Sequence, residues 1–306
     1  MTTRLYTHPA CLLHSAGPGH PESPLRLQTV LAALDADRFA ALDRAEAPRA
    51  TREQLARVHD EKMIDLLFAN VPQEGYVRID ADTTMSPDSM EAALRAAGAV
   101  CAAVDAAIDG AAQRAFCAVR PPGHHATHDT AMGFCLFNSV AIGAAHAMAR
   151  GIERIAIVDF DVHHGNGTQD IFWRTPNVLY ASTHQSPLYP GTGARSETGA
   201  GNIVNAPLPP GSGRKEFRAA FEEIVLPALR DSKPQLVMIS AGFDAHRLDP
   251  LADLNLEADD YAWATRELLD IAQAFASGRV ISSLEGGYSP AALAESTAAH
   301  VAAMLD

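Results

Sequence analysis

The chain has 306 residues, of which 47% are hydrophobic and 20% are charged, and its formal net charge is -13 at neutral pH. A chain of this size and apolar content can bury a large core, and we expect a single domain over residues 1–306. Its 24 basic residues are scattered and are outnumbered by 37 acidic residues, which argues against a nucleic-acid-binding surface.

The cysteine and hydropathy patterns predict a protein of the reducing cytoplasm. The four cysteines have neither Cys-x-x-Cys spacing nor the density of a disulfide framework. The N-terminal residues lack an apolar signal region, and the longest apolar runs are much shorter than a membrane span. We therefore expect no membrane association.

Helical and strand-like segments alternate along most of the chain. The expected helices cover residues 25–35, 52–57, 59–68, 86–108, 138–150, 215–230, 259–275 and 291–304. The expected strands cover residues 5–6, 115–119, 155–163, 178–183, 203–204, 236–240 and 280–283. This alternation predicts a three-layer α/β/α fold with a central, mostly parallel sheet. A Gly- and Pro-rich loop with His20 and Glu22 precedes the first long helix and is expected either to border a pocket or to lie on the surface.

Ionisable side chains follow five of the predicted strands. They are His124 and His125, then Asp161 and His163, then His184 close to Ser182, then Asp244 and Asp249, and finally Glu285 close to Tyr288. In open parallel sheets, functional sites form outside the carboxyl ends of the strands. We therefore expect these residues to converge on one site, because maintenance of the fold does not require such a pattern.

The run Asp159-Phe-Asp161-Val-His163 has the residue types of a metal site. If it is extended, the two acids and the histidine share one face of the strand. A strand-end turn with solvated histidines is the alternative for this stretch alone. Asp161 and His163 would provide two ligands of a catalytic metal, and Asp249, held by the following Pro250, is the preferred third.

Asp244 is a rival third ligand. Its position directly after Gly242-Phe243 favours a structural role, such as bonding loop amides. Two carboxylates and one imidazole neutralise a divalent cation, and this mixture of oxygen and nitrogen ligands suits Zn²⁺ and Fe²⁺ about equally well.

The residues of an acid–base mechanism are also present. His124 and His125 follow a stiff Pro-Pro-Gly turn, and either imidazole could act as a general base toward a water molecule. Such a base needs an acceptor for its other ring nitrogen, for which Asp159 and Asn166 are the candidates. Tyr288 lies in a Gly-Gly-Tyr turn, where its phenol could stabilise the oxyanion of a tetrahedral intermediate.

Four motifs together resemble the zinc-dependent histone deacetylase superfamily. They are Pro-Pro-Gly-His-His at 121–125, Asp-x-Asp-x-His-His-Gly-Asn-Gly at 159–167, Ser-Ala-Gly-Phe-Asp at 240–244 with Asp249-Pro250, and Leu-Glu-Gly-Gly-Tyr at 284–288. The similarity covers almost the whole chain from His14 onward. Asn166-Gly-Thr-Gln and Leu-Glu-Gly-Gly-Tyr resemble the class II and bacterial amidohydrolase branch more than class I.

The resemblance implies a role for each matching residue. Zinc would be held by Asp161, His163 and Asp249. The His124 and His125 pair would activate water, with His125 favoured as the proton carrier and Asp159 orienting His124, while Tyr288 would polarise the acyl carbonyl. Asn166 stands where class I members have an aspartate, and its amide is a weaker acceptor for His125 than a carboxylate.

The resemblance also implies a narrow tunnel for an acyl-lysine side chain. Phe134 and Tyr189 would line its walls, the Gly133 carbonyl would accept the amide N–H, and Leu256 would give an apolar rim. A structural potassium ion is implied at Asp159, Asp161, His163 and Ser182, and a second one at Phe172, Thr175 and Val178.

The favoured hypothesis is a zinc-dependent deacetylase that removes acetyl or related acyl groups from lysine side chains of proteins or peptides. An acetylpolyamine or other small-molecule deacetylase is the alternative, although the apolar Leu256 argues against an acidic rim and Asp253 and Glu257 leave the question open. An arginase-like enzyme would need a further carboxylate where Gly165 stands. A non-catalytic acyl-lysine binder would not need His124, His125 and Tyr288 together. The oligomeric state is left open.

Overall fold

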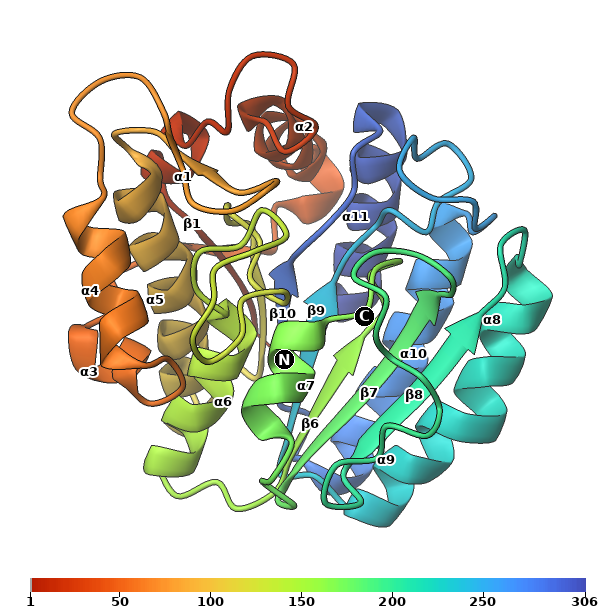
Figure 1. Ribbon diagram of the computed structural model, residues 1–306. Helices are drawn as coiled ribbons and strands as arrows, with labels where there is room; N and C mark the ends of the chain where they lie inside the picture. Colours follow the sequence, from red (N-terminus) through yellow and green to blue (C-terminus); the bar gives the residue numbers. More distant parts are fainter. Residues whose placement is uncertain (1) are drawn as a thin grey trace.

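A central eight-stranded sheet organises the molecule, as seen in a computed structural model that describes residues 2–306 (Figure 1). The strand order is β2-β1-β5-β10-β9-β6-β7-β8, and every neighbouring pair is parallel. The strands are β1 Thr3–Thr7, β2 Asp43–Glu46, β5 Arg114–Cys117, β6 Ile155–Asp159, β7 Val178–Gln185, β8 Ile203–Leu208, β9 Leu236–Ala241 and β10 Val280–Leu284. A separate antiparallel pair joins β3 Val77–Arg78 to β4 Thr84–Met85.

Helices cover both faces of the sheet, which confirms the predicted three-layer α/β/α fold (Figure 1). One layer contains α3 Arg52–Ala56, α4 Glu61–Ala69, α5 Ser89–Ile108, α6 Ser139–Ala149 and α7 Asn166–Phe172. The other contains α2 Pro24–Leu34, α10 Ala258–Phe275, α11 Pro290–Leu305 and the continuous helical segment α8 Arg214–Ala220, η2 Phe221–Val225 and α9 Leu226–Ser232. Short turns α1 Ala10–Leu13 and η1 Asp37–Phe39 flank α2.

The inner strands are buried on both faces, which explains their continuous apolar sequences. All residues of β5, β6, β7, β9 and β10 are buried. Small residues let the neighbouring helices approach one another closely. A Cβ atom on Gly143 of α6 would lie 2.3 Å from Cγ1 of Val100 on α5, so a larger residue there would push the two helices apart.

The predicted strand at 155–163 ends earlier than expected. The last residue of β6 is Asp159, and Asp161 and His163 lie in the bends that lead into α7, a helix that the sequence analysis missed. Side chains replace the ladder here: Asp159 Oδ1 accepts the Asp161 N–H at 3.1 Å, and Asp161 Oδ1 accepts the His163 N–H at 2.9 Å. Asp159, Asp161 and His163 are therefore brought together by hydrogen bonds within a turn, and not by the alternation of side chains along a strand.

The four cysteines are free thiols, and all are buried. No helix within residues 2–306 combines the length and the apolar character needed to cross a membrane.

Burial keeps two histidines, His300 and His59, in the neutral form. The Thr265 hydroxyl donates its proton to the backbone carbonyl of Tyr261 at 2.6 Å. His300 Nδ1 lies 2.6 Å from the same hydroxyl oxygen and is therefore the donor in that contact. His300 Nε2 then accepts a hydrogen bond from Ser282 Oγ at 2.8 Å. Burial lowers the pKa of His300 to about 3. Burial likewise lowers the pKa of His59 to about 4.

These histidines predict that acid destabilises the fold. Between about pH 6.5 and 4 the unfolded chain binds protons at both positions and the folded chain does not, so each histidine should cost about 1.4 kcal/mol of unfolding free energy per pH unit. Urea unfolding of the wild type and of His300→Gln across this range measures the slope. The variant should show a shallower slope. His128 is exposed and Asp170 raises its pKa, so below about pH 5.5 it is protonated in both the folded and the unfolded chain, and His128→Gln should leave the slope there unchanged. Equal slopes in all three proteins would contradict the assignment.

Candidate active site

Four adjacent strands, β5, β10, β9 and β6, end at the same edge of the sheet and place the site there (Figure 1). The loop after β5 carries His124, the loop after β6 carries Asp161, the loop after β9 carries Asp244, and the turn after β10 carries Glu285. The structure therefore brings together residues that the sequence analysis expected to converge.

Asp161, His163 and Asp244 form a group able to hold a metal ion, because one ligand atom from each lies within 4.8 Å of the others. His163 Nδ1 lies 3.1 Å from Asp161 Oδ1 and 3.1 Å from Asp244 Oδ2. All three residues are buried. Carboxylate oxygens and an imidazole nitrogen are ligands that zinc accepts, and three protein ligands leave a fourth position for water or substrate.

The electrostatics of this group also fit a cation. Burial, together with the charge of Asp161, raises the pKa of Asp244 to about 7. Burial disfavours a charged His163, but the carboxylates of Asp161 and Asp244 outweigh it and raise its pKa to about 10. A buried site that crowds carboxylates in this way attracts positive charge, which a proton on His163 or a metal ion would supply.

Glycines allow the loops to close around Asp161. A Cβ atom on Gly242 would lie 2.0 Å from Asp161 Oδ2, and one on Gly286 would lie 2.5 Å from the same oxygen. The Gly286 N–H donates to this oxygen at 2.8 Å. At Gly165 a Cβ atom would lie 2.3 Å from Asp159 Oδ2, which leaves no room for the further carboxylate that an arginase-like site requires.

Asp249 lies outside the three-residue group. Its Oδ2 accepts the Tyr288 N–H at 2.7 Å and its Oδ1 accepts the Leu251 N–H at 3.0 Å. It is slightly exposed, at 8%, whereas Asp244 is fully buried. Burial is the largest cause of its raised pKa, and the charge of Asp161 adds to it. Its role as the third zinc ligand stays a prediction.

The two adjacent histidines each have an acceptor behind them. His124 Nδ1 lies 3.0 Å from Asp159 Oδ2, and His125 Nδ1 lies 2.8 Å from Asn166 Oδ1. Since an amide oxygen can only accept, the proton of a neutral His125 is on Nδ1 and its Nε2 is free to take up another. The ring centroids of the two histidines are 4.0 Å apart.

Their surroundings push the pKa values of the two histidines apart. Burial, reinforced by the charges of His124 and His163, lowers the pKa of His125 well below its usual value. Burial acts in the same direction on His124, but Asp161 and Asp159 outweigh it and raise its pKa to about 10. A neutral His125 beside a charged His124 is an arrangement suited to general base catalysis.

A pocket of about 220 Å³ opens onto these groups. The residues that line it are Asp82, His125, Gly133, Phe134, His163, Leu188, Tyr189, Leu251 and Tyr288. The expected wall residues Gly133, Phe134 and Tyr189 are among them. Gly133 has φ +59°, and a Cβ atom there would lie 2.5 Å from the His125 ring. Its carbonyl, predicted to bind a substrate amide, accepts the weak Cys135 Sγ donor at 3.2 Å.

The structure corrects the predicted rim. Leu256 is fully buried in the hydrophobic core and does not line the pocket, whereas Leu251, five residues earlier, does. Asp82 and Leu188 were also missed. Asp82 follows the short strand β3, and its Oδ1 accepts the Gly133 N–H at 3.0 Å. No motif marks it, because it reaches the pocket only through the tertiary arrangement.

The loop with His20 and Glu22 borders the site, although Pro18 and Gly19 of the same loop are exposed. Glu22 is fully buried, and Arg120 Nη2 donates to its Oε2 at 2.5 Å while Arg26 Nη1 donates to Oε1 at 3.1 Å. Arg26 also donates to Gly287 O at 2.6 Å, and its guanidinium lies 4.7 Å from the Tyr288 ring centroid. The His20 ring packs edge-on against Phe134 at the pocket.

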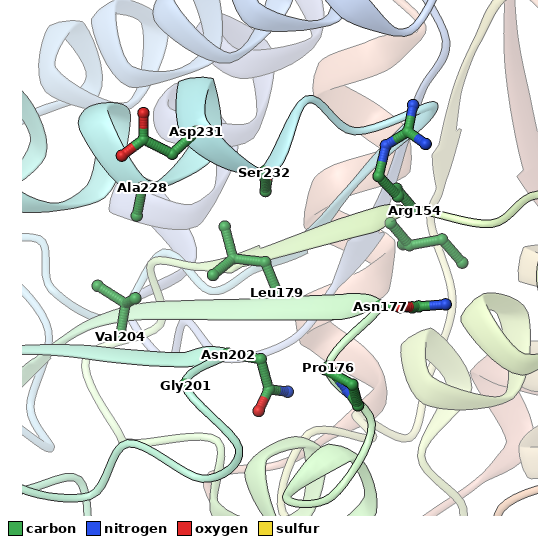
Figure 2. A pocket seen from close by; sticks show the side chains of 11 residues that line it. Arg154, Pro176, Asn177, Leu179, Gly201, Asn202, Val204, Ala228, Asp231 and Ser232 are labelled. Carbon is green, nitrogen blue, oxygen red and sulfur yellow. The ribbon is translucent and has the colours of Figure 1, made fainter.

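The residues predicted to hold potassium lie in two places. Ser182 Oγ is 2.9 Å from His184 Nδ1 beside the metal group, and a potassium ion near Asp159 and Ser182 stays a prediction. The carbonyl groups of Phe172, Thr175 and Val178 lie at the other end of the sheet. There they contact Asn202, which lines a second cavity of about 370 Å³ at the amino ends of β6, β7 and β8 (Figure 2).

Comparison with known proteins identifies the family. Residues 20–304 match the histone deacetylase domain. The chain is 39% identical to a histone deacetylase-like amidohydrolase of Pseudomonas aeruginosa, over 94% of this chain and 82% of the relative. It is also 39% identical to a probable deacetylase of Archaeoglobus fulgidus, with the same coverage. The HDA15 HD domain superposes with a TM-score of 0.93 at 36% identity, over 99% of this chain and 88% of that domain.

The chain therefore belongs to the histone deacetylase family. It is an enzyme of this zinc-dependent hydrolase family. The resemblance inferred from the motifs at 121–125, 159–167, 240–250 and 284–288 is confirmed. Two of the predicted metal ligands, Asp161 and His163, lie in the group that could hold a metal ion.

Proposed function

We propose that the protein hydrolyses the side-chain amide of acyl-lysine in proteins or peptides and releases acetate or a related acid. The observation that carries the proposal is one pocket onto which His125, His163 and Tyr288 all face. The pocket thus combines a neutral imidazole, a member of the metal group and a phenol. Amide hydrolysis uses all three kinds of group.

Asp161, His163 and Asp249 are the proposed zinc ligands, and Asp244 stays the rival third ligand, because its Oδ2 lies 3.1 Å from the same His163 nitrogen that faces Asp161. A catalytic ion must be reachable from the pocket, and Asp249 is more exposed than Asp244. Asp244 Oδ1 already accepts the Val162 N–H at 2.8 Å. When bound, zinc supplies a Lewis acid and lowers the pKa of water to about 7.

The chain's own residues would then handle protons and charge. His125 Nε2 takes the proton of the attacking water, since its Nδ1 proton is engaged by Asn166. The Tyr288 phenol donates a hydrogen bond to the acyl oxygen as it gains negative charge. His125 finally delivers the proton to the leaving lysine nitrogen. Arg26 keeps Tyr288 in place through its contacts with the ring and with Gly287 O.

The pocket favours an extended aliphatic side chain. Phe134, Leu188 and Leu251 give it largely apolar walls. Two acids that could have marked a polyamine site point elsewhere: Glu257 pairs with Arg247 at 3.0 Å, and Asp253 interacts with Gln185. Asp82 is the carboxylate in the lining, so an acetylpolyamine remains the second candidate substrate.

Four buried free thiols agree with a reducing cytoplasmic environment.

The ligand assignment predicts that His163→Ala and Asp249→Ala each weaken zinc binding by at least about 100-fold, because loss of a supporting residue alone costs about 10- to 100-fold. Zinc content after dialysis, measured by mass spectrometry, gives the readout. Asp253→Ala removes a nearby carboxylate outside the group and should retain zinc. Near-stoichiometric zinc in Asp249→Ala, with loss in Asp244→Asn, would assign the third ligand to Asp244.

Tyr288→Phe should lower acetate release from an acetyl-lysine peptide by about 10²- to 10³-fold, because it removes one oxyanion donor. Zinc content and peptide affinity should not change. Tyr189→Phe removes a hydroxyl from the pocket wall and should retain most activity. A wild type that contains zinc and binds the peptide without turnover would instead indicate a non-catalytic acyl-lysine binder.

For the substrate, kcat/KM should be higher for an acetyl-lysine peptide than for acetylated spermidine or putrescine. Asp82→Asn should weaken turnover of the cationic polyamines more than that of the peptide. A tenfold preference for a polyamine, about 1.4 kcal/mol in the transition state, would reverse the ranking. Peptides with longer acyl groups, assayed beside these, define the acyl length.

A further inference from the structure

Three backbone carbonyl groups converge between the end of α7 and the start of β7. They belong to Phe172, Thr175 and Val178, and we call them the carbonyl ring. Carbonyl oxygens gathered in this way are typical ligands of a monovalent cation. The sequence resemblance implied a second potassium ion at these residues.

A side chain fills the carbonyl ring. Asn202 Nδ2 lies 2.9 Å from Phe172 O, 3.1 Å from Thr175 O and 2.8 Å from Val178 O. Asn202 precedes β8 and is only 4% exposed. Figure 2 shows it at the edge of the cavity that Pro176 and Asn177 also line.

The orientation of the amide follows from its other contact. Asn202 Oδ1 accepts the Ala200 N–H at 3.0 Å. Rotating the amide by 180° would place an NH₂ group against that N–H and an oxygen against three carbonyl oxygens, so both ends would lose their hydrogen bonds. The NH₂ group therefore faces the ring.

The residues present do not fit a cation in this ring. The amide nitrogen is within hydrogen-bond distance of all three oxygens, so an ion coordinated by them would need the space that the nitrogen fills. An ion would also face the positive ends of two N–H bonds. We propose that the Asn202 carboxamide replaces the second monovalent cation and that this protein binds no potassium at the carbonyl ring.

The replacement changes how the segment is stabilised. The amide joins the turn between α7 and β7 to the residue before β8 without any dependence on the salt present. The same helix α7 begins at Asn166, the partner of His125. The anchoring of this helix at its far end should therefore be insensitive to potassium.

Crystals of the wild type and of Asn202→Ala soaked in rubidium chloride test the proposal directly. The anomalous difference map should show a rubidium ion at the carbonyl ring in the variant and not in the wild type. A rubidium ion at the carbonyl ring of the wild type would overturn the proposal. The wild-type crystal alone therefore tests whether the ring binds a cation, even if the variant does not fold. A variant ring without an ion would also count against it.

Thermal unfolding gives a second readout. In choline chloride, Asn202→Ala should unfold about 2–6 °C below the wild type, because buried carbonyl groups lose their donor. Potassium chloride at the same ionic strength should restore much of this loss in Asn202→Ala, beyond any effect on the wild type. Asn177→Ala, at an exposed asparagine of the same cavity, should respond as the wild type does. Equal potassium responses in all three proteins would contradict the proposal.

Discussion

Burial of carboxylates is the constraint on which the rest of this structure depends. Asp159, Asp161, Asp244 and Glu285 are each at most 1% exposed. A buried carboxylate is costly unless donors and opposite charges surround it. Glu285 Oε2 accepts the backbone N–H groups of Gly123 and His124 at 2.6 and 3.1 Å, and so connects the ends of β10 and β5. The bonds that satisfy the acids thus also hold the loops of the site together.

The same constraint explains the division of labour between the histidines. His124 and His163 lie among the carboxylates, which raise their pKa values to about 10, whereas burial lowers the pKa of His125, which faces the pocket, well below its usual value. The amide of Asn166 fixes the position of the His125 proton without adding charge. A second buried ionic cluster, centred on Glu22, brings Arg26 against Tyr288 from the N-terminal loop. The acid–base groups of the site are therefore positioned by elements from both ends of the chain.

Prediction from sequence succeeded where burial leaves a strong pattern. The central strands are apolar on both faces, and their positions were found to within a few residues. It failed for β2, whose sequence Asp-Arg-Ala-Glu carries the polar residues of an edge strand, and for the two-residue strands β3 and β4. It also extended β6 too far, because alternating polar and apolar residues continue past Asp159 although the backbone leaves the sheet there.

The sequence by itself determined the class of chemistry. Acids, histidines and a Gly-Gly-Tyr turn after successive apolar strands indicated the edge of the sheet, a candidate metal site and the family, since parallel strands carry their carboxyl ends to one side. Only the tertiary structure decided which groups touch. It placed Asp244 next to His163, 81 positions away in the chain, moved the pocket rim from Leu256 to Leu251, and set Asn202 into the carbonyl ring. Such contacts depend on loop conformation and side-chain direction, which residue order alone does not specify.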